Sequence, residues 1–134
     1  MLIEWSVPAL GDLEEIAGYL RKDDEAMAVA MVGRIFAAAE MLQDFPRAGR
    51  EGRVKGTREM LVKRAPYVLV YVTLEDRVVI LRALHERRDW PGTGEGEDWQ
   101  AEAIKEGVRQ ADAGDFASEE EVRQTFGKWD VDTD

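Results

Sequence analysis

The sequence predicts an α+β fold in which an N-terminal helical hairpin packs on a three- to four-stranded antiparallel sheet. Apolar residues recur every three or four positions as far as residue 44, and every second position between residues 57 and 84. The first pattern is typical of amphipathic helices and the second of strands. Charge then changes abruptly: residues 1–91 carry a formal charge of −1, whereas residues 92–134 carry −9. A globular part followed by an acidic interaction segment is therefore expected.

The N-terminal third is expected to form a short strand and then two helices. Leu2–Trp5 is the candidate strand, and Ser6 with Pro8 favours a helix start directly after it. The apolar stripe of this helix consists of Leu10, Leu13, Ile16 and Leu20. Asp12 is expected to interact with the dipole at the start of the helix. After a charged break, the second helix has a stripe of Val29, Val32, Phe36, Ala39 and Leu42, and Phe45-Pro46 ends it.

The middle of the chain is expected to form an exposed loop and then strands. Residues 47–56 combine glycines with basic side chains, which is typical of a loop. Glu75-Asp76 is a short polar connection, so the strands on either side of it should form an antiparallel hairpin. Tyr67–Tyr71 is apolar on both faces and should be a central strand. The three expected strands are Thr57–Arg64, Pro66–Leu74 and Arg77–Leu84.

The C-terminal part divides into a glycine-rich linker, residues 92–97, and a segment, residues 98–134, with two short helical patterns. The second pattern begins with a capping box at Ser118 and Glu121. Helices this short and acidic cannot build their own core, so they are expected to wrap the preceding domain. Their expected anchors are Trp99, Ile104, Val108, Phe116, Val122, Phe126 and Trp129.

Composition excludes several classes of function. The chain has no cysteine and one histidine, so disulfides and thiolate chemistry are excluded, and neither a metal site nor a cofactor is expected. It lacks an apolar run long enough for a membrane span, and a cytoplasmic location is the expectation. Its acidity argues against non-specific binding of nucleic acid.

Six motifs that occur together in one protein family lie in order along the first part of the chain: Trp5-Ser6, Asp12-Leu13, Phe45-Pro46, Gly56 to Met60, Tyr67 to Tyr71, and Ile80 to Pro91. On these residues the chain resembles the RelE/ParE family of type II toxins over residues 1–91. The resemblance implies the fold described above and the activity of a bacterial toxin.

Residues 98–134 resemble a different protein, the C-terminal part of a small antitoxin. The similar residues are Asp98-Trp99, Ala103-Ile104, Gly107, Ala111 to Gly114, Phe116, Glu120 to Val122, Phe126 and Lys128-Trp129. In such ribbon-helix-helix antitoxins of the ParD/CopG type this part wraps the toxin, and their DNA-binding half has no counterpart here. The resemblance implies a toxin joined to its own neutralising segment, whether as a natural fusion or an engineered one. The segment is expected to bind in cis or in a swapped homodimer.

The toxin resemblance leaves two activities open. Some family members are ribosome-dependent mRNA endoribonucleases, and others block DNA gyrase without cleaving anything. Cleavage of RNA requires a base, an acid and cations that stabilise the phosphate charge. The candidates for these roles are Arg58, Arg64, Arg82, His85 and Tyr67, with Tyr71 as a second phenol. Each also has a structural interpretation: paired arginines, a strand-end histidine or core tyrosines.

Two further observations bear on the target. Regular alternation would place Arg82 on a face with Ile80, and His85 on the other with Leu81, so that the two would not converge. A ribosome-directed nuclease should be strongly basic, whereas residues 1–91 carry −1. A non-enzymatic gyrase inhibitor is therefore the favoured function, and an inactive scaffold of the same fold is a third alternative. The candidate target-binding residues are Arg87, Arg88 and Trp90.

Overall fold

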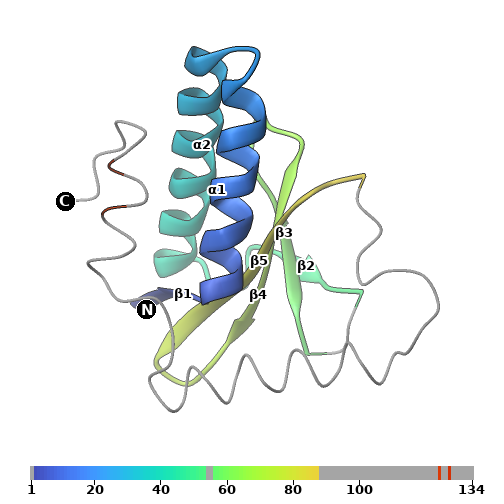
Figure 1. Ribbon diagram of the computed structural model, residues 1–134. Coiled ribbons are helices and arrows are strands. Elements are labelled where there is room, and N and C mark those ends of the chain that lie inside the picture. Colours follow the sequence, from blue (N-terminus) through green and yellow to red (C-terminus); the bar gives the residue numbers. More distant parts are fainter. Residues whose placement is uncertain (1, 54–55, 88–123, 125–126, 128–134) are drawn as a thin grey trace.

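The structure, a computed structural model, describes residues 2–53 and 56–87 together with positions 124 and 127. In the order of the chain, the strands and helices are β1 (Leu2–Trp5), α1 (Val7–Arg21), α2 (Glu25–Asp44), β2 (Arg50–Glu51), β3 (Arg58–Leu61), β4 (Tyr67–Thr73) and β5 (Arg77–His85). The strands form one sheet in the order β1-β5-β4-β3-β2 (Figure 1). The predicted α+β class is confirmed.

The sheet differs from the expected one in two respects. Within the described residues it has five strands instead of three or four, because the loop expected at residues 47–56 contains the two-residue strand β2. It is also not purely antiparallel, since β1 pairs with β5 in parallel, Leu2 opposite Arg77 and Trp5 opposite Ile80. The remaining pairs are antiparallel and include the expected β4–β5 hairpin. β4 is the central strand, as the sequence predicted.

Both helices begin where the sequence predicts. The Ser6 hydroxyl accepts a hydrogen bond from the Ala9 N–H at 3.1 Å, and the Asp24 carboxylate accepts one from the Met27 N–H at 3.1 Å. Each side chain therefore satisfies a backbone donor that the first helical turn leaves without a partner. α2 ends at Asp44, immediately before Phe45, as expected. None of the described helices is long and apolar enough to cross a lipid bilayer.

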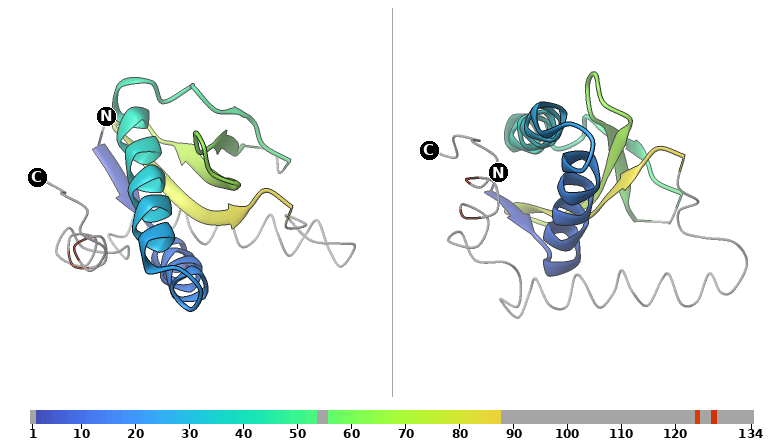
Figure 2. Two further views of the ribbon diagram at one scale, coloured as in Figure 1. Left: turned by 90° about the horizontal axis from the view of Figure 1, so that it is seen from above. Right: turned by 45° about the horizontal axis from the view of Figure 1, so that its top comes forward.

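The two helices lie together on one face of the sheet (Figure 2). The main core fills the space between them and the sheet, and its largest fully buried side chains include Leu13, Ile35 and Tyr71. A separate cluster of Val72, Val79 and Leu81 lies on the opposite face. The sheet thus has two apolar faces, which agrees with the continuous apolar run of β4.

An irregularity in β5 overturns the alternation expected from the sequence. Val70 of β4 lies opposite Arg82, but the next residue, Tyr71, lies opposite Ile80, so Leu81 is an extra residue in β5. One extra residue reverses the alternation of the side chains that follow it. His85 therefore shares the helix-facing side with Ile80 and not the opposite side with Leu81, and Arg82 is shifted in the same way.

Candidate functional site

Arg82 forms an ion pair with Asp12 of α1. Its Nε and Nη2 donate to the two carboxylate oxygens at 2.6 and 2.9 Å, and the Ala83 N–H also donates to Asp12, at 3.1 Å. The Asp12 side chain is only 7% exposed. The hydrogen bonds that Arg82 donates to Asp12 raise the pKa of Arg82, although burial opposes this effect. The arrangement closes the edge of β5 beyond the end of β1, where none of the described strands supplies hydrogen-bond partners.

Tyr71 and Arg58 fix the chain that follows α2. The Tyr71 hydroxyl accepts a hydrogen bond from the Gly49 N–H and donates one to the Pro46 carbonyl, both at 2.9 Å. Arg58 Nη1 donates to the Gly49 carbonyl at 2.8 Å. Burial raises the pKa of Tyr71, although the bond from Gly49 and the charge of Arg58 oppose this effect. The Tyr71 hydroxyl and the Arg58 guanidinium thus both bind backbone groups, which is a structural role.

Tyr67 and His85 form an aromatic pair at the open end of the β4–β5 hairpin, where β4 begins and β5 ends. Their ring centroids are 5.7 Å apart and nearly perpendicular, at 85°. Burial raises the pKa of Tyr67, and nearby Tyr19 raises it further, so the phenol stays protonated at neutral pH. The Nδ1 atom of His85 accepts a hydrogen bond from the Arg87 N–H at 3.1 Å. His85 and Arg87 are exposed, which makes this the most accessible group of polar side chains among the candidates.

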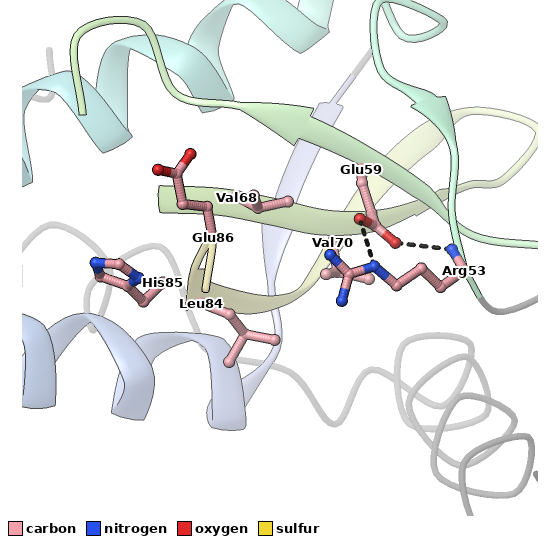
Figure 3. Close-up of a pocket in the computed structure, with 7 residues that line it drawn as sticks. All are labelled: Arg53, Glu59, Val68, Val70, Leu84, His85 and Glu86. Atoms are coloured by element: carbon pink, nitrogen blue, oxygen red, sulfur yellow. Dashed lines mark hydrogen bonds and ion pairs between the residues drawn. The ribbon is translucent and has the colours of Figure 1, made fainter. Parts of the chain in front are cut away.

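Glu59 is buried beside a small pocket on the sheet face opposite the helices (Figure 3). Its carboxylate accepts a hydrogen bond from the Arg53 N–H at 2.7 Å and lies 3.5 Å from Arg50 Nη2 and 3.8 Å from Arg53 Nε. The pocket itself, about 10 Å³, has room for about one water molecule. Its lining residues are Arg53, Glu59, Val68, Val70, Leu84, His85 and Glu86.

The remaining predicted residues divide into one that is described and several that are not. Arg64 lies in the turn between β3 and β4 with a positive φ of 62°, and its carbonyl accepts a hydrogen bond from Arg34 at 2.7 Å. The described residues include no group of three side chains that could hold a metal ion. The predicted residues outside the described part are Arg88, Trp90, Trp99, Ile104, Val108, Phe116, Val122, Phe126 and Trp129.

The structure does not bring the five nuclease candidates to one place. Arg82 lies at the β5 edge, and Arg58 lies at the loop after α2. Tyr67 and His85 meet at the hairpin end. The expected role of Asp12, an interaction with the dipole at the start of α1, is wrong. Asp12 is the sixth residue of α1, and its carboxylate accepts hydrogen bonds from Arg82. Its position between Ala9 and Leu13, on the buried stripe of the helix, was the available signal.

Similarity to known proteins extends over the part of the chain that forms this fold. A solved structure titled "Chromosomal ParDE TA system from P. aeruginosa" matches with a TM-score of 0.59 and 25% identity, covering 63% of this chain and 95% of that one. The Sinorhizobium fredii protein "Putative toxin Y4kP" is 40% identical over 89 residues, 66% of this chain and 92% of the relative. "Toxin RelE2" of Caulobacter vibrioides is 33% identical over 86 residues, 64% of this chain and 96% of the relative.

The fold and these relatives define the class: a toxin of a type II toxin-antitoxin system. The family model described as "ParE toxin of type II toxin-antitoxin system, parDE" matches residues 3–90. The chain belongs to the ParE toxin family.

Proposed function

We propose that residues 1–91 form a ParE-like toxin that inhibits DNA gyrase without cleaving RNA. The observation that carries this proposal is the bonding of the candidate cations. Arg82 is held by the buried Asp12, and Arg58 by the Gly49 carbonyl, so both serve the fold. A nuclease needs cations directed at a phosphate. The formal charge of −1 over residues 1–91 also fits a protein target better than the ribosome, a polyanion.

One observation favours the alternative, a RelE-like ribosome-dependent mRNA endoribonuclease. His85 is exposed beside Tyr67, and Arg87 follows it at the same end of the hairpin. A histidine with a neighbouring cation is a plausible acid-base group for RNA cleavage. However, the raised pKa of Tyr67 makes its phenol a weak proton donor. Cleavage of ribosome-bound mRNA is therefore the second candidate activity of the toxin part.

The proposal also covers the acidic segment, residues 98–134, as a tethered inhibitor derived from an antitoxin. The match to the ParE family ends at residue 90, with one residue between it and the glycine-rich residues 92–97. A solved relative is titled as a ParDE system, so an antitoxin is the expected kind of partner for the toxin part. A short tether gives an effective concentration on the order of millimolar, so modest contacts suffice for inhibition.

The test compares residues 1–91 with the full chain under a tightly controlled promoter in bacteria. The shorter chain corresponds to almost the whole length of the relatives, so it is expected to fold alone. It should arrest growth, whereas the full chain should not. Purified protein should then inhibit gyrase supercoiling while leaving ribosome-bound mRNA intact. Cleaved mRNA with normal supercoiling would support the nuclease, and normal growth with both chains would contradict a toxin function.

A further inference from the structure

The turn between β3 and β4 brings together three cationic side chains from two separate parts of the chain. Lys63 and Arg64 lie in the turn itself, and both are exposed. Arg34 reaches the turn from α2, where its Nη1 donates to the Arg64 carbonyl at 2.7 Å. We define the cationic turn as Arg34, Lys63 and Arg64. Within residues 2–53 and 56–87, none of the three forms an ion pair with a carboxylate. Like charges held close together repel one another, so an anion would be stabilised there.

Arg64 adopts a backbone conformation that favours a different residue type. The Ala65 N–H donates to the Val62 carbonyl at 3.2 Å, which closes a turn with Lys63 and Arg64 at its centre. Arg64 has a positive φ of 62°, and Lys63 does not have a positive φ, which is the pattern of a type II turn. Glycine or asparagine is preferred at this position, because a larger side chain is crowded there. Since Arg34 contacts only the backbone of Arg64, the fold does not require the Arg64 guanidinium.

The other basic region of the described chain, which follows α2, is largely neutralised by its own neighbours. Arg50 and Arg53 lie 3.5 and 3.8 Å from the buried carboxylate of Glu59. Arg58 donates to the Gly49 carbonyl at 2.8 Å. The cationic turn is therefore the better candidate for a contact with an anionic partner.

The cationic turn lies at the same end of the sheet as Arg87, one of the residues expected to bind the target. The Glu86 N–H donates to the Pro66 carbonyl at 2.8 Å, which fixes the end of β5 beside the turn. Arg87 follows directly and is exposed. Glu86 lines the pocket on the sheet face opposite the helices, whereas Arg34 belongs to a helix on the other face (Figures 2 and 3). The positive charge of this end thus extends from α2 across the turn.

We propose that the cationic turn binds an acidic surface of a second protein, the target of the toxin. The inference rests on the proposed function for the identity of that target, DNA gyrase. Guanidinium groups bind carboxylates with two parallel hydrogen bonds, so the cluster suits a surface rich in aspartate or glutamate. Leu61, two residues before Lys63, is 52% exposed and adds apolar contact area, which is typical of a contact between proteins.

A nucleic acid fits the rest of the molecule less well than an acidic protein surface does. The formal charge is −1 over residues 1–91 and −10 over the whole chain. Asp23, Asp24 and Glu25 are exposed between the two helices. A DNA duplex carries one negative charge about every 1.7 Å along its axis, so it would repel these carboxylates. An acidic patch of limited extent can contact the cationic turn alone.

The test uses the full chain and a short fluorescent polyglutamate peptide as the acidic probe, with anisotropy as the measurement. Arg64→Gly removes the cation, keeps the carbonyl that Arg34 binds and suits the positive φ. Arg47→Gln, exposed in the loop after α2, removes the same charge and is the matched control. We expect about 3-fold weaker binding for Arg64→Gly and about 10-fold for Lys63→Gln/Arg64→Gly, with Arg47→Gln like the natural chain. The differences should disappear at about 1 M salt.

Urea denaturation separates a lost contact from a lost fold. The midpoint of Arg64→Gly should be no lower than that of the natural chain, because glycine suits the turn. A lower midpoint would assign the Arg64 side chain to the fold and overturn the proposal. Absence of probe binding by the natural chain, equal binding by Lys63→Gln/Arg64→Gly, or an equal loss in Arg47→Gln would also overturn it. Tighter binding of a DNA duplex through the same residues would replace the acidic protein by a nucleic acid.

Gyrase supercoiling connects the contact to the target. Lys63→Gln/Arg64→Gly in residues 1–91 should require about 10-fold more protein for half-inhibition, in line with its weaker binding of the probe. Unchanged inhibition by this variant would overturn the assignment of the surface to the target. If the probe distinguishes the full-chain variants while residues 1–91 inhibit no supercoiling, the inference about the surface stands and the proposed function fails.

Discussion

Replacing Asp12 by alanine should lower the free energy of unfolding by about 3 kcal/mol. Asp12 is 7% exposed and accepts three hydrogen bonds, two from Arg82 and one from the Ala83 N–H. An orphaned buried N–H costs about 1–3 kcal/mol. Breaking a buried ion pair costs about 3–5 kcal/mol. Arg82 is 27% exposed, so water recovers part of this loss and the expected value lies at the lower end.

Urea denaturation followed by far-ultraviolet circular dichroism measures this effect. With a typical slope of about 1.5 kcal/mol per molar urea, the midpoint should fall by about 2 M. Asp23→Ala, in the exposed turn between the helices, is the control and should change the free energy by less than about 0.5 kcal/mol. The double change Asp12→Leu/Arg82→Met should recover part of the loss, since it leaves no unpaired charge, although the Ala83 N–H still lacks its acceptor. A loss below about 1 kcal/mol for Asp12→Ala would refute the structural role assigned to the pair.

Three further outcomes are expected. Tyr71→Phe should destabilise the fold by about 1–3 kcal/mol, because it leaves the buried Gly49 N–H and the partly buried Pro46 carbonyl without the tyrosine hydroxyl; Tyr19→Phe, 71% exposed, is the control, and equal stability of the two variants by urea denaturation would contradict this. Burial raises the pKa of Glu4 above 4.5, so the folded state holds its proton more tightly and Glu4 costs stability as pH rises through that value. Glu4→Gln should therefore gain stability relative to the natural chain between pH 4 and pH 7, and a constant difference in unfolding free energy would argue against it. Phe126→Ala/Trp129→Ala should partly release toxicity, since interface anchors often contribute about 2 kcal/mol or more each; growth curves identical to those of the natural full chain would count against an anchoring role.

Elements defined by local patterns could be predicted from the sequence. The cap at Ser6 and the end of the second helix at Phe45 follow from residues within one helical turn. The β4–β5 hairpin follows from alternation on both sides of a short polar connection. β2 could not be predicted, because a strand of two residues has no periodicity and depends on its pairing with β3.

Features that depend on distant partners were missed or placed wrongly. Leu81 becomes an extra residue only because β4 fixes the register on both sides of it, and no property of its own marks the irregularity. Arg82 finds its partner 70 residues earlier in the chain. Sequence could therefore name Arg82 as a candidate cation, but its engagement by Asp12 required the fold. The same holds for Glu59, which is buried and held by Arg50 of β2 and by Arg53 in the loop after it.

The parallel pairing of β1 with β5 determines when the toxin fold can be completed during synthesis. Residues 2–5 must wait for residues 77–80 before the sheet can close, so most of the toxin part is made before it gains its final shape. At about 5–20 residues per second, the ribosome synthesises residues 86–134 within roughly 3–10 s. If residues 98–134 inhibit the toxin as proposed, the inhibitor is therefore synthesised within seconds of the strand that completes the toxin fold.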